Sequence, residues 1–168
     1  MIHEYRAVLD EVEIRPLSYE DSQLYRVLRN KNNHRKWFIY QDIISEEEQA
    51  VWYEHYLSDV SDAMFAIYYQ DKFVGGNAVY HIDNSLKRGE YGRLLLDEGL
   101  VGGKGIGKVS TLLACSIAKD LLGLKELYLE VFPDNIPALK TYEYAGFMRR
   151  NKYDSVREKD MITLFKFL

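Results

Sequence analysis

The feature that most constrains the fold of this chain is a glycine-rich run at residues 102–108, with glycine at positions 102, 103, 105 and 107. The run follows a strand-like apolar segment and precedes apolar residues at helical spacing, so the chain passes here from strand through loop to helix. Glycine lets the backbone approach a ligand closely, and the N–H groups of a first helical turn lack intrahelical partners. With the helix dipole and the charges of Lys104 and Lys108, the run predicts a site for phosphate or pyrophosphate.

The hydrophobic pattern on either side of this loop predicts one mixed α/β domain covering residues 1–168. The expected helices span residues 20–30, 45–57, 104–122 and 134–145, and the expected strands span residues 12–17, 63–69, 73–82, 90–96, 126–132, 147–153 and 161–167. In the first helix, Leu24, Val27 and Leu28 are the apolar residues at helical spacing. The chain has no internal repeat or linker, and 168 residues suit a single domain.

The composition of the chain argues against several classes of function. Its 22 basic and 26 acidic side chains give a net charge of −4, whereas a general nucleic-acid binder usually has a basic excess. No apolar run approaches the roughly 20 residues of a membrane span. The N-terminus has no secretory signal pattern and Cys115 is the single cysteine, so we expect a cytoplasmic protein. The four histidines are scattered along the chain, so we expect no metal site.

Two nucleotide-binding motifs nearly match the glycine run, and each fails at one position. A P-loop needs Ser or Thr after its lysine to hold magnesium, and Val109 occupies that place. The dinucleotide fingerprint needs glycine where Lys108 stands. A P-loop type of nucleotide binder stays open as an alternative hypothesis, which predicts magnesium-dependent ATP binding.

A second motif follows the loop, and the two together resemble a known family. Residues 135–147 match the pattern N-x-x-A-x-x-x-Y-x-x-x-G-F at each defining position, 28 residues after the loop glycine Gly107. Loop and motif in this order resemble the GNAT superfamily of N-acetyltransferases. The resemblance implies a central, mostly antiparallel twisted sheet, flanked by helices and splayed between the fourth and fifth expected strands, 90–96 and 126–132. One departure is Gly102, where the family usually has Arg or Gln.

The resemblance also implies a reaction, in which a primary amine directly attacks the thioester of acetyl-CoA within a ternary complex. Tyr142 matches the motif tyrosine that protonates the leaving thiolate, and Glu130 and Glu90 are the candidates for the general base. The residues implied in binding acetyl-CoA are Leu95, Leu96, Gly103, Lys104, Gly105, Ile106, Gly107, Lys108 and Asn135. No metal is implied. A catalytically silent member of the superfamily that binds acyl-CoA is kept as an alternative.

The acceptor is expected to be shaped by the segment before residue 63 and by the last pair of strands. This segment contains arginines and aromatic residues, such as Arg29 and Trp37, and in this it resembles members of the superfamily that act on nucleotide-linked amino sugars. Such side chains suit that ligand through charge and stacking. The acidic run Glu46–Glu48 would suit a polyamine or a protein N-terminus, although it also forms a favourable first helical turn. The expected partner is therefore a small-molecule or peptide amine, and a homodimer is expected by analogy with the family.

Overall fold

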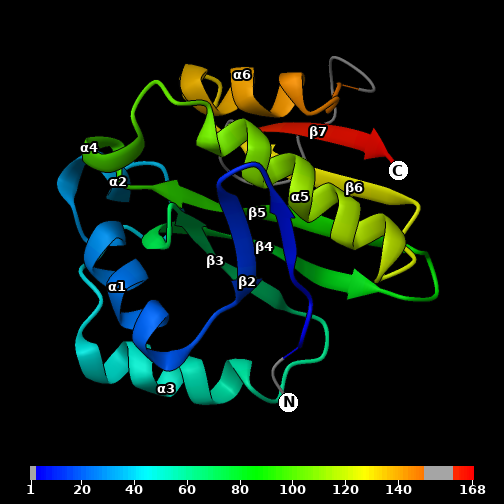
Figure 1. Ribbon diagram of the computed structural model, residues 1–168. Helices are drawn as coiled ribbons and strands as arrows, with labels where there is room; N and C mark the ends of the chain where they lie inside the picture. Colours follow the sequence, from blue (N-terminus) through cyan, green and yellow to red (C-terminus); the bar gives the residue numbers. More distant parts are fainter. Residues whose placement is uncertain (1–2, 150–160) are drawn as a thin grey trace.

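A computed structural model of the protein describes residues 3–149 and 161–168. These residues form one seven-stranded sheet with helices on both faces (Figure 1). The strands lie in chain order across the sheet. They are β1 (Ala7–Leu9), β2 (Val12–Pro16), β3 (Ala63–Tyr69), β4 (Lys72–Asp83), β5 (Arg88–Leu96), β6 (Glu126–Val131) and β7 (Ile162–Phe167). The helices are α1 (Tyr19–Arg29), α2 (Asn32–Arg35), α3 (Glu46–Tyr56), α4 (Glu98–Val101), α5 (Ile106–Asp120) and α6 (Ile136–Tyr144).

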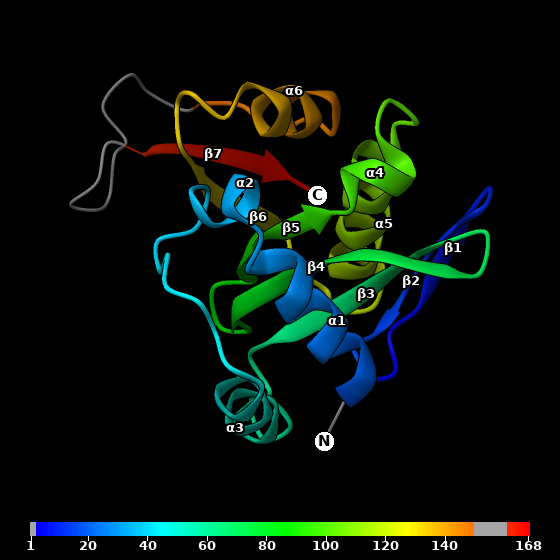
Figure 2. The same cartoon turned by 90° about the vertical axis from the view of Figure 1, so that its left-hand side faces the viewer.

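The two faces of the sheet carry separate cores. Figure 2 shows α5 on one side of the sheet and α1 and α3 on the other. Strand β3 is buried on both sides, since Phe65 and Ile67 belong to the core under α5, whereas Met64 and Ala66 belong to the core under α1 and α3. This explains why β3 reads as a continuous apolar run rather than as an alternating one.

The expected elements agree with the structure except in a few short pieces. The strand β1 and the single-turn helices α2 and α4 were not expected, because three or four residues give too short a pattern to recognise. The expected strand at 147–153 falls partly outside the described residues, and within them Met148 forms an isolated bridge with Phe165. The capping signal at Ser45 is confirmed, because the Ser45 side chain accepts a hydrogen bond from the Glu48 N–H and Glu48 accepts one from the Ser45 N–H.

The apolar residues of the first helix did not indicate its buried face correctly. Leu24 and Val27 are 49% and 53% exposed. Leu28 is buried as expected, and the face that it shares also carries Asp21 and Tyr25. Both are tied to strands by hydrogen bonds: the Tyr68 hydroxyl donates to Asp21 at 2.6 Å and the Tyr25 hydroxyl donates to the Arg93 carbonyl at 2.8 Å. Polar groups that are satisfied in this way can be buried in place of aliphatic ones.

The splay between β5 and β6 is confirmed, and it opens the functional region. These two strands are the sole parallel pair among the described residues, and they pair only where Arg88–Glu90 meets Glu126–Tyr128. Beyond Glu90, β5 bulges at Arg93, which has a left-handed φ of 53°, and the register with β4 shifts there. The C-terminal half of β5 therefore turns away from β6.

Candidate active site

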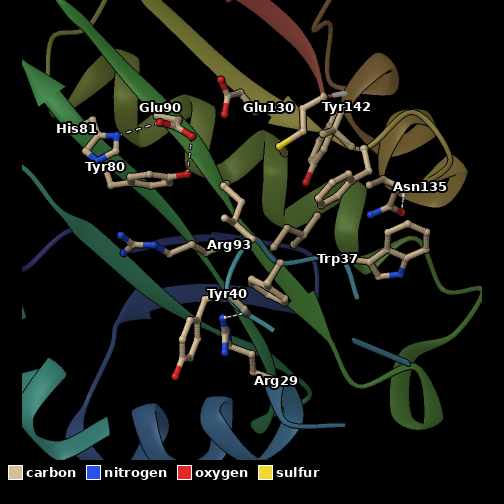
Figure 3. A pocket seen from close by; sticks show the side chains of 18 residues that line it. Arg29, Trp37, Tyr40, Tyr80, His81, Glu90, Arg93, Glu130, Asn135 and Tyr142 are labelled. Atoms are coloured by element: carbon tan, nitrogen blue, oxygen red, sulfur yellow. Dashed lines mark hydrogen bonds and ion pairs between the residues drawn. The ribbon is translucent and has the colours of Figure 1, made fainter. Parts of the chain in front are cut away.

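A cavity of about 360 Å³ lies where β5 and β6 separate (Figure 3). Side chains reach it from both strands, from β4, from α6 and from the loop that follows α2. All three residues expected to carry out proton transfer, Glu90, Glu130 and Tyr142, line this one cavity although they lie far apart in the sequence. The splay therefore brings together two carboxylates and a phenol.

Glu90 is the more enclosed of the two carboxylates, with 5% of the residue exposed. Its Oε1 accepts a 2.6 Å hydrogen bond from the Tyr80 hydroxyl, and its Oε2 lies 2.9 Å from Nδ1 of His81. Burial, together with the charge of Glu90, raises the pKa of Tyr80 far above its usual range, so this phenol stays protonated and donates. Glu130 is half-buried on β6 and lines the same cavity.

The Tyr142 side chain enters the cavity from α6 (Figure 3). Only 7% of the residue is exposed, and its ring packs edge-on against Tyr91 with 5.9 Å between the centroids. Burial raises the pKa of Tyr142 above that of an ordinary tyrosine. The phenol therefore holds its proton at any physiological pH, as a proton donor must.

A narrower groove of about 190 Å³ extends from this cavity toward the glycine run. Leu95, Leu96, Gly107 and Asn135 all line it, so four of the residues expected to bind acetyl-CoA are brought together. The side chain of Ile106 is buried in the core and that of Asn135 caps α6 by accepting from the Ala138 N–H at 3.3 Å. The cavity and the groove adjoin, because they share five lining residues: Trp37, Phe38, Leu94, Asn135 and Ala138.

The glycine run forms an uncapped helix N-terminus. Gly103 and Gly105 have φ values of 76° and 74°, in the left-handed region where glycine is favoured, and a Cβ at either one would meet open space. The N-cap of α5 is Gly105, which has no side chain to accept a hydrogen bond from the first turn. Lys104 and Lys108 flank the run, with their ammonium groups over the rings of Tyr69 and Tyr144 at 5.0 and 4.6 Å.

The structure gives a steric reason for Gly102. It ends the one-turn helix α4, and a Cβ there would lie 2.6 Å from the Glu98 carbonyl oxygen. A side chain of the family's usual Arg or Gln would need this turn to shift. The loop relies on backbone at this position.

The segment expected to shape the acceptor is held by the side chains of Arg29, the last residue of α1, and Asn30, its C-cap. Asn30 exchanges two hydrogen bonds with the backbone of Ile44, at 2.8 and 3.0 Å, and Arg29 donates to the Tyr40 carbonyl at 2.7 Å. These contacts place Trp37, Phe38 and Tyr40 on the cavity wall. A second cavity, also about 360 Å³, lies beside the first and shares four lining residues with it: Arg29, Phe38, Tyr40 and Arg93.

Sequence reasoning missed three polar residues of the site: Tyr80, His81 and Arg93. Their positions depend on backbone irregularities, because His81 and Arg93 have φ values of 49° and 53° in the middle of a sheet. No local sequence signal marks such bulges when the residue is not glycine. Arg93 donates to both carboxylate oxygens of Asp62, at 2.7 and 2.9 Å, and its guanidinium lies 4.2 Å from the centroid of the Tyr80 ring.

Two further observations concern other kinds of site. Across residues 3–149 and 161–168, no group of three or more His, Cys, Asp or Glu side chains is arranged to hold a metal ion. No helix within these residues is long and apolar enough to cross a membrane. The hydroxyl nearest the P-loop position, on Ser110, is fully buried and donates to the Gly107 carbonyl, so it does not face the loop as a magnesium ligand would.

Comparison with known proteins agrees with this geometry. Over 136 residues the chain is 25% identical to spermidine N(1)-acetyltransferase of Escherichia coli K12, which covers 81% of this chain and 72% of that protein. Spermidine N-acetyltransferase of Vibrio cholerae, solved with CoA and spermine, superposes with a TM-score of 0.82 at 20% identity, over 94% of this chain and 95% of that one. RimJ of Mycobacterium smegmatis, solved with CoA-disulfide, gives 0.77 at 16% identity, over 93% of this chain and 81% of that one.

The family pattern decides the assignment. The sequence pattern of the acetyltransferase (GNAT) family matches residues 23–147, which include the splayed strands, the glycine run and the motif of α6. The expected enzyme class and co-substrate, N-acetyl transfer from acetyl-CoA, are those of this family. The chain belongs to the acetyltransferase (GNAT) family.

Proposed function

We propose that this protein transfers the acetyl group of acetyl-CoA to a small primary amine held in the cavity between β5 and β6. The observation that supports this most is the convergence of Glu90, Glu130 and Tyr142 on one cavity, which continues as a groove toward the glycine run. A direct transfer needs a base for the amine, an acid for the thiolate and a channel for the donor, and this region offers one of each.

Acetyl-CoA fits the groove in one direction. Its pyrophosphate meets the uncapped N-terminus of α5, where the N–H groups of the glycine run and the nearby lysines favour an anion. Its pantetheine arm follows the C-terminal half of β5, at Leu95 and Leu96, where β6 has turned away. The thioester then reaches the cavity lined by Tyr142.

The proposed reaction balances in three steps. A carboxylate, Glu90 or Glu130, takes a proton from the acceptor ammonium and leaves a neutral amine. The amine nitrogen forms a bond to the thioester carbonyl carbon, and the carbon–sulfur bond then breaks. Tyr142 gives its proton to the departing CoA thiolate, the new amide nitrogen gives up its extra proton to the Tyr142 phenolate, and the carboxylic acid formed in the first step releases its proton to solvent.

A polyamine is the first acceptor we propose. Two of the proteins compared above are spermidine N-acetyltransferases, and the carboxylates of Glu90 and Glu130 give the cavity two groups that attract a cation. The chain would in that case share its acceptor class with proteins to which it is only 20–25% identical in sequence.

A nucleotide-linked amino sugar is the second acceptor, and the lining of the two cavities favours it. Arg29 and Arg93 lie where the cavities meet, with the aromatic rings of Phe38 and Tyr40 beside them. Glu48 is the one carboxylate that lines the second cavity among the described residues. Cations and rings suit a diphosphate and a base better than they suit a polyamine chain.

An assay of CoA release over a panel of amines tests the proposal. The panel contains spermidine, spermine, a nucleotide-linked amino sugar and a peptide with a free N-terminus. We expect release with at least one of them and loss of release in the Tyr142→Phe variant, which still binds acetyl-CoA. Binding of acetyl-CoA with no acetylation of any amine would support the catalytically silent alternative. Thermal stabilisation by Mg-ATP and not by acetyl-CoA would overturn the assignment of the loop.

A further inference from the structure

The environment of Glu90 carries an inference that rests on the proposed function. We propose that Tyr80 and His81 are positioning residues that make Glu90, and not Glu130, the general base of the reaction. The two residues are adjacent on β4, and together they bind both oxygens of the carboxylate on the neighbouring strand.

The geometry of this clamp is well defined. The Tyr80 hydroxyl donates to Oε1 at 2.6 Å, and Nδ1 of His81 lies 2.9 Å from Oε2 as its donor in the Nδ1–H tautomer. Only 6% of the Glu90 side chain is exposed, so the carboxylate has lost most of its hydration. A buried carboxylate without donors is costly, and two aligned donors offset that cost while they fix its rotation. The lone pairs that remain can serve the acceptor in the cavity.

The neighbouring residues are arranged to leave room for this clamp. Gly92 faces Tyr80, and a Cβ at position 92 would lie 3.0 Å from the Tyr80 hydroxyl oxygen. The Arg93 guanidinium also covers the Tyr80 ring and is itself fixed by Asp62. The ring is therefore confined by a glycine and an anchored arginine, with its hydroxyl directed at Glu90.

The backbone of His81 is also unusual. Its φ of 49° lies in the left-handed region, and the pairing of β4 with β5 changes register between Tyr80 and Asp83. A regular strand would send residues 80 and 81 to opposite faces of the sheet. The irregularity here lets both side chains reach the same carboxylate, at the cost of an unfavourable conformation of the kind that is found near functional sites.

Substitutions of His81 can distinguish the role of its hydrogen-bond donor from the role of its imidazole ring. In His81→Asn, the amide nitrogen stands where Nδ1 stands in histidine, and asparagine tolerates a positive φ. In His81→Gly, the donor is lost without added backbone strain. Tyr80→Phe removes the other donor and keeps the ring under Arg93.

The test is steady-state kinetics of these variants with the amine that the wild type acetylates. We expect kcat to fall about 10-fold or more in His81→Gly and in Tyr80→Phe, and KM for acetyl-CoA to stay within about twofold, because the donor groove is untouched. His81→Asn should recover most of the loss, and added imidazole should partly rescue His81→Gly. Glu90→Gln should cost about 100-fold and Glu130→Gln much less.

Three results would overturn the inference. Unchanged kcat in both His81→Gly and Tyr80→Phe would show that the clamp does not act on the reaction. Equal losses in His81→Asn and His81→Gly would show that the ring, and not the donor, is needed. A larger loss in Glu130→Gln than in Glu90→Gln would assign the base to the other strand.

A measurement without turnover keeps this inference distinct from the proposed function. Nitrogen chemical shifts of the His81 ring should report the Nδ1–H tautomer in the wild type and a change in Glu90→Gln. If the wild type acetylates no amine but these shifts are found, the proposed function fails and Glu90 loses its role as base, while the clamp itself stands. If the shifts are absent in an active enzyme, only the inference fails.

Discussion

The proposed donor side and the proposed acceptor side of this molecule are built by different means. The donor side, around the glycine run and the start of α6, offers mainly backbone: left-handed glycines, an uncapped helix end and the released edge of β5. The acceptor side is made of side chains that line the two cavities, from α1, α3, β4 and the loop after α2, and some of them are held by individual hydrogen bonds. Backbone recognition requires particular residue types at fixed spacing and so leaves a motif, whereas a lining of side chains leaves none.

The largest effect is expected where the two sides meet, at Tyr142. Tyr142→Phe removes the proton donor and keeps the ring packed against Tyr91. We expect kcat to fall by about 100-fold or more, with the Kd for acetyl-CoA unchanged, because the phenol acts on the leaving thiolate. An assay of CoA release measures kcat, and calorimetric titration with acetyl-CoA measures its Kd. A parallel rise in Kd would mean that Tyr142 is a binding group of the donor side.

A substitution in the groove should affect the donor side alone. A Cβ at Gly107 would lie 3.4 Å from Leu96 and 3.7 Å from Thr141, so the branched side chain of Gly107→Val would fill the groove. We expect KM for acetyl-CoA to rise by about 10-fold, because the variant weakens binding of acetyl-CoA equally in the ground state and the transition state. KM for the amine should stay constant. Lys119→Val, at an exposed position near the far end of α5, is the control for a valine placed in this helix. Equal rises in both KM values would contradict the separation of the two sides.

The converse change should affect the acceptor side alone. Asn30→Ala removes two hydrogen bonds to Ile44, each worth about 1 kcal/mol, and loosens the end of the loop that carries Tyr40, which lines both cavities and not the groove. We expect a several-fold rise in KM for the amine with KM for acetyl-CoA unchanged. Asn33→Ala, at an exposed position on α2, should have no effect on either value.

The smallest effect is expected at Cys115, the single thiol of the chain. Burial raises the pKa of Cys115 to about 12, so the thiol stays protonated and is no nucleophile near neutral pH. Cys115→Ala should keep kcat within about twofold. In the native protein, the rate of reaction with a disulfide reagent should still climb with pH above 9, because the thiolate population grows until the pKa is reached. Loss of activity in this variant would point to an acyl-enzyme in place of direct attack.

Much of the fold was predictable because its elements are long and periodic. The hairpin of β3 and β4, the long helix α5 and the capping box of α3 follow from local patterns that the structure preserves. The face of α1 could not be read in this way, because Tyr25 and Asp21 are buried through hydrogen bonds to residues 68 and 93, which local periodicity does not reveal. The sites were predictable to a similar degree: Tyr142 and the glycine run lie in motifs, whereas Tyr80, His81 and Arg93 do not.

The sequence by itself determined the family and the co-substrate, and it led to the proposed place of the donor, since left-handed glycines and a capped helix require particular residues at particular spacings. Only the tertiary structure decided which polar groups surround Glu90 and how the two cavities join. The physical reason is that those contacts arise between strands and loops that are distant in sequence, at bulges where φ is positive without glycine. A one-dimensional pattern encodes the conformations that the backbone can adopt, and the pairing of side chains across a sheet depends on register and on splay.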